Sequence, residues 1–371
     1  MVTRSDRLDH VHSDIRGPLY QEALRMESEG INVLKLNTGN PGRFGFKLPN
    51  SVRQALALHI DEAVPYCDVR GMAAARNVIC TYHIGRGLQG IMPNDVFICN
   101  GVSEAASMLL NALIGTGDEI LLPSPCYSLW SNNAYLCGGK PVFYRCDPAN
   151  EWNPDIEDIQ SKITDRTKAI LVINPNNPTG AVFSKEEVSE IARLAKKYDV
   201  AILADELYSR QILEKDFTYT HMRALPEKPD KLITIMGPSK TESLSGFRLG
   251  GGCGTPEIIT RMEKLQAVVS LRCAGYNQAA FYRWFSEPDG WMEKRIADHR
   301  QIRDDILAVI NSCPGCWARP TEGGSYIFMQ LPKLKVDIFQ FTKLCRAQAS
   351  VTVTPGTEFG KQYSDFIRMN F

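Results

Sequence analysis

Residues 169–208, AILVINPNNPTGAVFSKEEVSEIARLAKKYDVAILADELY, indicate the fold class of the protein. Two runs within them, 169–173 and 201–204, are almost purely apolar and lack the polar alternation of a half-exposed strand. Such runs are typical of strands that are buried on both faces of a parallel sheet. Between them, residues 184–197 predict a helix, because Ser184 suits its N-cap, glutamates its first turn and lysines its last. The segment therefore predicts a strand–helix–strand unit.

The same pattern extends along most of the chain. Its spacing, roughly 20 to 30 residues in many places, leaves room for helices that cross between parallel strands. We therefore predict an α/β domain with a mostly parallel sheet over residues 45–285. From Trp291 onward the pattern changes to long helices and separate strands, which predicts a smaller α+β domain made of residues 1–44 and 286–371. The further apolar runs are 96–99, 119–122, 141–144 and 232–235.

Composition excludes several classes of function. The 371 residues include 42 Lys and Arg and 42 Asp and Glu, so the net charge is zero. This balance argues against binding to nucleic acid or to an anionic membrane, which needs an excess of basic charge. Apolar residues make up 44% and charged residues 23%, as in ordinary globular proteins. The polar start of the chain and the absence of any apolar run of ~20 residues predict a cytoplasmic protein without a membrane helix.

The 11 cysteines are odd in number and scattered, which is typical of reduced thiols in a cytosolic enzyme. Cys313-Pro-Gly-Cys316 has the spacing of a redox couple or half a zinc site. No second pair accompanies it, and Pro-Gly is also turn chemistry, so a turn before a strand is favoured. His10 and His12 are expected to be solvated, and no metal site is predicted.

Several familiar nucleotide and hydrolase motifs are missing. No G-x-G-x-x-G follows a strand, and no G-x-x-x-x-G-K-[ST] is present. Rossmann dinucleotide binding and P-loop chemistry therefore lack their usual signatures. No G-x-S-x-G is present either, which weakens an α/β-hydrolase interpretation.

Polar residues follow four of the predicted strands at their carboxyl ends, where open α/β sheets bind ligands. Ser103 begins a helix and either binds an anion or only caps that helix. Asn177 lies in a Pro- and Gly-rich loop that is either a ligand-binding loop or a rigid turn. Asp205 ends a buried strand, where a carboxylate needs a cationic partner. Lys240 follows another buried strand, which favours a neutral, nucleophilic amine, and Arg248 suits a phosphate.

A neutral lysine, a buried carboxylate and a phosphate site together suit one cofactor, pyridoxal phosphate. Its aldehyde reacts with a lysine, its ring nitrogen needs a carboxylate to stay protonated, and its phosphate needs an anchor. These three features are present in the chain in the form of Lys240, Asp205 and Arg248.

The motifs resemble those of the fold-type I, class I/II aminotransferases that depend on pyridoxal phosphate. The resemblance covers nearly the whole chain and is nearest to the bacterial alanine aminotransferase branch. It implies an α/β large domain, a smaller α+β domain and a homodimer with shared active sites. The motifs that carry it are Asn174-Pro-Asn-Asn-Pro-Thr-Gly180, Ala204-Asp-Glu-Leu-Tyr208, Ser239-Lys240 followed by Arg248-Leu-Gly250, and Leu36-Asn-Thr-Gly-Asn-Pro41.

The resemblance also implies the roles of individual residues. Lys240, Asp205 and Tyr208 match the catalytic set, with Lys240 as the lysine that binds the cofactor covalently and Asp205 as the partner of its ring nitrogen. Tyr66 matches a tyrosine that reaches the phosphate of the neighbouring subunit. The cofactor-binding positions of this chain are Val102, Ser103, Glu104, Tyr127, Asn177, Asp205, Tyr208, Ser239, Lys240, Arg248 and Tyr66, and the substrate-binding positions are Gly39, Asn177 and Arg368.

The chain departs from the family pattern at several positions. They are interpreted either as drift around the site or as a roomier substrate pocket. The chain also ends three residues after Arg368, without the terminal helix that the family usually has, so a truncated C-terminus is expected. The departures are Ser13, Gly237, Pro238, Glu242, Gly251 and Gly275-Tyr-Asn-Gln278.

The expected function is an aminotransferase that moves an amino group between an L-amino acid and a 2-oxo acid. The alternative is another pyridoxal-phosphate enzyme that eliminates, replaces or forms carbon–carbon bonds, possibly with S-adenosylmethionine. Glu242 would suit that alternative as an extra acid or base. A catalytically silent regulator is disfavoured, because Lys240, Asp205 and Arg368 are all present.

Overall fold

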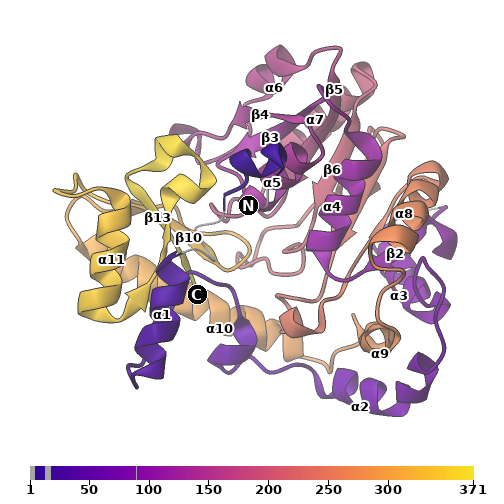
Figure 1. Ribbon diagram of the computed structural model, residues 1–371, viewed down its shortest axis with the longest axis horizontal. Helices are drawn as coiled ribbons and strands as arrows, with labels where there is room; N and C mark the ends of the chain where they lie inside the picture. The colour runs from indigo at the N-terminus through magenta and orange to yellow at the C-terminus, as the bar shows by residue number, and fades with distance from the viewer. Residues whose placement is uncertain (1–4, 13–17, 89) are drawn as a thin grey trace.

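A computed structural model describes residues 5–12, 18–88 and 90–371 of the chain (Figure 1). A seven-stranded sheet forms its centre, with the strand order β2-β8-β7-β6-β5-β3-β4. Strands β7, β6, β5, β3 and β4 are parallel neighbours, and β8 runs antiparallel to both of its neighbours. The strands are β2 (Val96–Cys99), β3 (Glu119–Ser124), β4 (Lys140–Arg145), β5 (Thr167–Ile173), β6 (Ala201–Asp205), β7 (Leu232–Met236) and β8 (Gly250–Cys253).

Helices cover both faces of this sheet, which confirms the predicted α/β class. On one face, a core joins the sheet to α4 (Val102–Leu113), α5 (Ser128–Leu136) and α8 (Pro256–Val269). On the other face, α6 (Ile156–Lys162) and α7 (Lys185–Lys197) pack on the same strands. Every residue of β2, β3, β6, β7 and β8 is buried, which is why these segments show no polar alternation.

Helix α7 begins where the sequence predicts. The Ser184 hydroxyl accepts a hydrogen bond from Glu187 N at 3.2 Å. The Glu187 carboxylate in turn accepts one from Ser184 N at 2.7 Å. This reciprocal capping box satisfies two amide groups that a helix N-terminus leaves without partners.

A second, antiparallel sheet has the strand order β12-β13-β10-β9. In Figure 1 it lies beside α10 and α11, on the side of the molecule away from β2. Near the chain start, β1 (Leu34–Lys35) pairs in parallel with β11 (Val351–Thr352). The elements of this part are α1 (Pro18–Ser28), α10 (Trp291–Ser312), β9 (Trp317–Ala318), β10 (Tyr326–Gln330), α11 (Ile338–Ala349), β12 (Thr354–Pro355) and β13 (Phe366–Asn370).

A third group of helices closes the end of the sheet beyond β2. It contains α2 (Asn50–Leu58), α3 (Ala73–Gly85), α9 (Gly275–Gln278) and the short 3₁₀ helix η4 (Ile60–Ala63). Helices α2 and α3 share one apolar core with β2 and with residues 280–285. Helix α9 packs against η4.

The segment Cys313-Pro-Gly-Cys316 forms a turn. Cys316 N donates to Cys313 O at 3.1 Å, so these residues form the predicted turn between α10 and β9. Across the described ranges, no group of three His, Cys, Asp or Glu side chains is arranged so that it could hold a metal ion. No helix within those ranges has both the length and the apolarity that a membrane crossing requires.

Candidate active site

The loops that carry the motif residues meet at one edge of the seven-stranded sheet. Ile173, Asp205 and Ile235 are aligned across β5, β6 and β7. The segments that follow these strands therefore emerge side by side at their carboxyl ends, where ligands bind in open α/β sheets.

Asp205 is buried at this edge, with 6% of its surface exposed. Its Oδ2 accepts a hydrogen bond from Trp130 Nε1 and its Oδ1 one from Leu207 N, both at 3.2 Å. Burial raises the pKa of Asp205 to about 6, although these hydrogen bonds oppose the shift. Among the described residues no cation forms an ion pair with it. The cationic partner that the sequence predicts for Asp205 would therefore come from a ligand.

Lys240 lies in a turn after β7, and its side chain reaches the N-terminal segment at Gly39. Its Nζ donates to Gly39 O at 2.7 Å. The Tyr326 hydroxyl lies at the same place, since a Cβ built on Gly39 would fall 2.8 Å from Tyr326 Oη and 3.1 Å from Lys240 Nζ. Tyr208 Oη donates to Tyr326 Oη at 3.0 Å. The lysine amine, two tyrosine hydroxyls and a backbone carbonyl thus form one cluster.

At the N-terminus of α4, where the sequence predicts an anion site, the cap is a different residue from the expected Ser103. Gly101, with φ +89°, is the N-cap and offers no side chain, whereas Ser103 is an exposed residue of the first turn. Arg248 lies beside it, because a Cβ on Gly101 would fall 2.5 Å from Arg248 Nη2. Free amide groups, a hydroxyl and a guanidinium here suit a phosphate. Glu104 turns away from this site, since its carboxylate accepts from Asn100 N at 2.6 Å.

Arg368, on β13, is 2% exposed. Its guanidinium lies beside the Lys240 cluster, 4.2 Å from the ring centre of Tyr326. Its Nη1 donates to Asn177 Oδ1 at 3.0 Å, and its Nη2 donates to Asn37 O at 2.7 Å and Thr354 Oγ1 at 3.3 Å. Its Nε has no hydrogen-bond partner. All three acceptors are neutral, and no carboxylate of the described residues pairs with this guanidinium. The site therefore holds a buried cation that is free to bind an anion.

The remaining expected residues lie at different distances from this cluster. Tyr127 is half-buried at the start of α5, close enough to act electrostatically on Tyr208. Val102 and Ser239 are buried at the α4 N-terminus and beside Lys240. Tyr66 stays outside the cluster within this chain. It is 78% exposed, and Arg272 stacks on its ring at 4.8 Å.

Comparison with known proteins identifies the family. The family model described as aminotransferase class I and II matches residues 31–371. The chain belongs to this family. The glutamate–pyruvate aminotransferase AlaA of Haemophilus influenzae is 46% identical over 388 residues, covering 100% of this chain and 93% of that relative. The alanine aminotransferase of Mycobacterium tuberculosis is 43% identical and covers 99% of this chain and 87% of its own.

Solved structures agree with this assignment. An aminotransferase from Escherichia coli superposes with a TM-score of 0.93 at 34% identity, covering 100% of this chain and 94% of that one. An alanine aminotransferase from Pyrococcus furiosus gives 0.91 at 31% identity, with 99% and 94% covered. The protein is thus a fold-type I aminotransferase, which moves an amino group between an amino acid and a 2-oxo acid. Members of this family depend on pyridoxal phosphate.

Several aminotransferase site residues escaped the sequence analysis. Trp130 donates to Asp205, and Tyr326 accepts from Tyr208 and lies beside Lys240. Asn37 and Thr354 hold the guanidinium of Arg368. Tyr326 and Thr354 lie on short strands, and Trp130 lies in a helix without a motif. Only Asn37, in the Asn37-Thr-Gly-Asn-Pro segment, stands in a stretch that had been singled out.

Glu242 does not face the aminotransferase site as a free acid or base. It is completely buried and forms an ion pair with Arg210, whose guanidinium also forms two hydrogen bonds of 2.9 Å with Glu287. Burial raises the pKa of Glu242 to about 6, although Arg210 opposes the shift. Glu242 thus belongs to a buried ion network.

The glycine departures do not leave empty space either. A Cβ on Gly251 would fall 2.8 Å from Ile79 Cδ1 and 2.9 Å from Phe97 O, inside the core. A Cβ on Gly237 would fall 3.0 Å from Leu249 O. The hypothesis of a roomier substrate pocket therefore finds no support at these positions. Ser13 lies outside the described residues.

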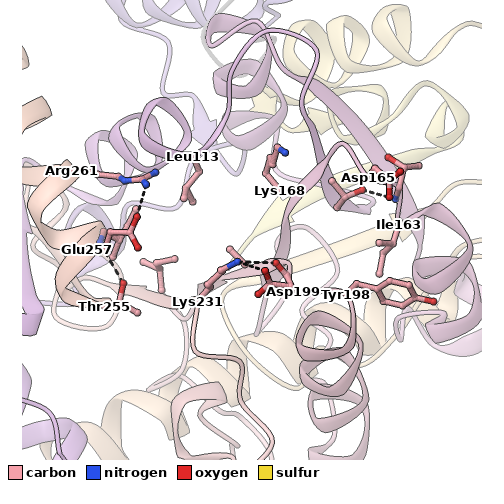
Figure 2. A pocket seen from close by; sticks show the side chains of 15 residues that line it. Leu113, Ile163, Asp165, Lys168, Tyr198, Asp199, Lys231, Thr255, Glu257 and Arg261 are labelled. Carbon is pink, nitrogen blue, oxygen red and sulfur yellow. Dashed lines mark hydrogen bonds and ion pairs between the residues drawn. The ribbon is translucent and has the colours of Figure 1, made fainter.

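A large cavity lies elsewhere, at the amino ends of the parallel strands (Figure 2). It has a volume of about 630 Å³. Lys231 at its rim is paired with Asp199, and Arg261 with Glu257. Because these cations are already paired and lie at the edge opposite Asp205, the cavity is not part of the aminotransferase site.

Asp205 gives the first testable prediction. A carboxyl group whose pKa is raised by folding weakens the fold progressively as the pH rises above its unfolded value of about 4. We therefore expect Asp205→Asn to gain about 1–2 kcal/mol of stability relative to wild type between pH 5 and pH 7.5, in the cofactor-free protein. Chemical denaturation at both pH values measures this.

The exposed Asp199 provides the matched control, since its carboxylate has 85% of its surface in solvent. Asp199→Asn is expected to change the stability equally at the two pH values. An Asp205→Asn variant that follows the same flat pattern would show that burial does not perturb Asp205.

Proposed function

We propose that this aminotransferase exchanges the amino group between L-alanine or L-glutamate and the corresponding 2-oxo acids, pyruvate and 2-oxoglutarate. The observation that carries the proposal is the buried guanidinium of Arg368, which has only neutral partners among the described residues. Guanidinium binds a carboxylate through two parallel hydrogen bonds, and every amino acid and 2-oxo acid brings such a carboxylate. The choice of substrates rests on the 43–46% identity to the relatives named above.

The described residues fit pyridoxal phosphate as the cofactor. The α4 N-terminus, Ser103 and Arg248 would hold its phosphate, and Asp205 its protonated ring nitrogen. Lys240 would bind its aldehyde, and Tyr208 and Asn177 would donate to its ring oxygen. Arg248 has a φ of +51°, an unusual conformation for arginine that is typical of functional sites.

When bound, this cofactor withdraws electrons from the Cα of an attached amino acid and so makes its proton removable. The residues of this chain supply the other parts of the reaction. Arg368 would orient the substrate by its carboxylate, which fixes Cα relative to Lys240. Lys240 Nζ is the nearby group that can take the Cα proton and return it. Asp205 would be ionised beside the protonated ring nitrogen and would stabilise the positive charge there.

The direct test of this function follows the nitrogen atom. The purified protein is incubated with pyridoxal phosphate, ¹⁵N-labelled glutamate and pyruvate, and the alanine formed is analysed by mass spectrometry. We expect ¹⁵N-alanine and 2-oxoglutarate in equal amounts. Ammonia release without labelled alanine would instead favour elimination chemistry.

Lys240 carries the second prediction. Borohydride reduction of the loaded protein is expected to fix the cofactor on the peptide that contains Lys240. Lys240→Ala should lose this adduct and lower the rate of ¹⁵N transfer by at least about 10²-fold, because it removes both attachment and the base. Lys264→Ala, an exposed lysine on α8, is the control and should leave both unchanged. An adduct that persists in Lys240→Ala would identify a different lysine.

Arg368 carries the third prediction. Arg368→Lys keeps the charge but cannot form two parallel hydrogen bonds, so the KM for alanine is expected to rise about 10–100-fold. Ethylamine, which is alanine without its carboxylate, should react at the same single-turnover rate in both proteins. Equal losses for alanine and ethylamine would mean that Arg368 supports the fold rather than the substrate.

We also propose that the protein forms a homodimer with shared active sites and acts as two domains, residues 45–285 and residues 1–44 with 286–371. The proposal of a dimer rests on exposed apolar residues in segments 58–66 and 268–276, here called the apolar patch, which meet where α9 packs against η4 and Arg272 stacks on Tyr66. Tyr66 lies in this patch, and Ala274 beside it contacts Asn100, which precedes the α4 N-terminus, at 3.5 Å. The patch consists of Leu58, Ile60, Val64, Tyr66, Val268, Val269, Leu271 and Tyr276, which are 42–86% exposed.

Val268 gives the test of the dimer, because it is 86% exposed in the single chain. An aspartate there costs a monomer almost nothing, whereas buried in an interface it lacks a partner. Val268→Asp is therefore expected to shift the protein to monomers in sedimentation velocity and to weaken cofactor binding. The control, Val309→Asp, changes a residue on α10 that is 63% exposed and should keep the dimer. A wild-type monomer with full activity would contradict the shared site.

A further inference from the structure

Two buried tyrosine hydroxyls meet beside Lys240, and the reaction outlined above uses only that of Tyr208. Tyr208 Oη donates to Tyr326 Oη at 3.0 Å, and the two rings pack edge to face with centroids 5.8 Å apart. Tyr326 is 4% exposed and lies on β10 of the four-stranded sheet. Tyr326 thus belongs to the four-stranded sheet, whereas Tyr208 follows β6 of the seven-stranded sheet. The two hydroxyls meet between these sheets.

Tyr326 is also in contact with Lys240. The Tyr326 hydroxyl and the Lys240 amine lie next to the same point, 2.8 and 3.1 Å from a Cβ built on Gly39, and the charge of the amine acts on that hydroxyl. Lys240 Nζ itself donates to Gly39 O at 2.7 Å. A side chain at Gly39 would crowd both groups, because a Cβ would fall 2.8 Å from Tyr326 Oη and 3.1 Å from Lys240 Nζ. The amine thus lies beside two oxygens, the Gly39 carbonyl that accepts from it and the Tyr326 hydroxyl.

The two tyrosines differ in their electrostatic surroundings. Burial raises the pKa of Tyr208 well above its ordinary value, and Tyr326 raises it further. Burial also acts to raise the pKa of Tyr326, but the charges of Lys240 and Arg368, together with the hydrogen bond from Tyr208, outweigh it and lower that pKa. The guanidinium of Arg368 lies 4.2 Å from the Tyr326 ring centre. Tyr208 is therefore the donor and Tyr326 the acceptor of the pair.

We propose that Tyr326 is a positioning residue for Lys240, whose amine donates a hydrogen bond to the Tyr326 hydroxyl oxygen and is thereby held beside Arg368. The inference rests on the proposed function, in which Arg368 binds the substrate carboxylate. A lysine side chain has several rotatable bonds and can adopt many conformations. Holding its amine next to the bound substrate lowers the entropic cost of reaching the geometry for proton transfer. A tyrosine that served only the core would use its ring alone, and phenylalanine would replace it without loss.

The cofactor-free protein provides a test that does not depend on activity. Acetic anhydride acylates only neutral amines, so the rate of Lys240 acylation against pH, measured on its peptide by mass spectrometry, gives a midpoint. In Tyr326→Phe the ammonium form loses an acceptor, and the midpoint is expected to fall by about half a pH unit or more. Tyr144→Phe is the control. Tyr144 is fully buried and its hydroxyl donates to Leu171 O at 2.9 Å, away from Lys240.

The loaded enzyme gives the second measurement. Tyr326→Phe is expected to lower kcat about tenfold while the KM for the amino acid and the cofactor affinity stay unchanged. Tyr326→His keeps an acceptor and should recover part of the midpoint shift. An unchanged midpoint in Tyr326→Phe would overturn the positioning role, even in an active enzyme. A wild-type protein without amino transfer would contradict the proposed function and leave the midpoint comparison intact.

Discussion

The buried guanidinium of Arg368 is the constraint on which the rest of the site depends. A charge that is removed from water without an opposite charge is costly, and the fold keeps this one with neutral oxygens only. Those oxygens come from Asn37, Asn177 and Thr354, which lie in three segments far apart in the chain. The cation can be held this way only when both sheets and the N-terminal segment are in place. The proposed substrate site thus depends on the whole fold.

Asp205 is the counterpart with the opposite sign. It is buried with two hydrogen-bond donors and no cation among the described residues. The protein does pair buried charges where no ligand is involved, as Arg210 shows with Glu242 and Glu287. In the proposed function, the two unpaired charges bind ligand groups: Arg368 a carboxylate and Asp205 a protonated ring nitrogen. Such sites exchange stability for function.

The sequence predicted the parts of this structure that short-range patterns encode. The buried strands, the capped helix α7 and the motif residues Asp205 and Lys240 at strand ends all follow from local periodicity and position. The ion network of Glu242 could not be predicted, because its partner Arg210 is 32 residues away in the chain and Glu287, which also pairs with Arg210, is 45 residues away. Tyr326 was missed for the same reason, since nothing on its strand indicates that its hydroxyl meets Lys240.

One measurement tests the role of Arg368 most directly. It is a crystal structure of the protein with pyridoxal phosphate and an unreactive analogue of the substrate amino acid. We expect both carboxylate oxygens of the analogue to lie about 2.7–2.9 Å from guanidinium nitrogens of Arg368, with the reacting carbon facing Lys240. A carboxylate bound elsewhere, with Arg368 still held only by Asn37, Asn177 and Thr354, would contradict the account.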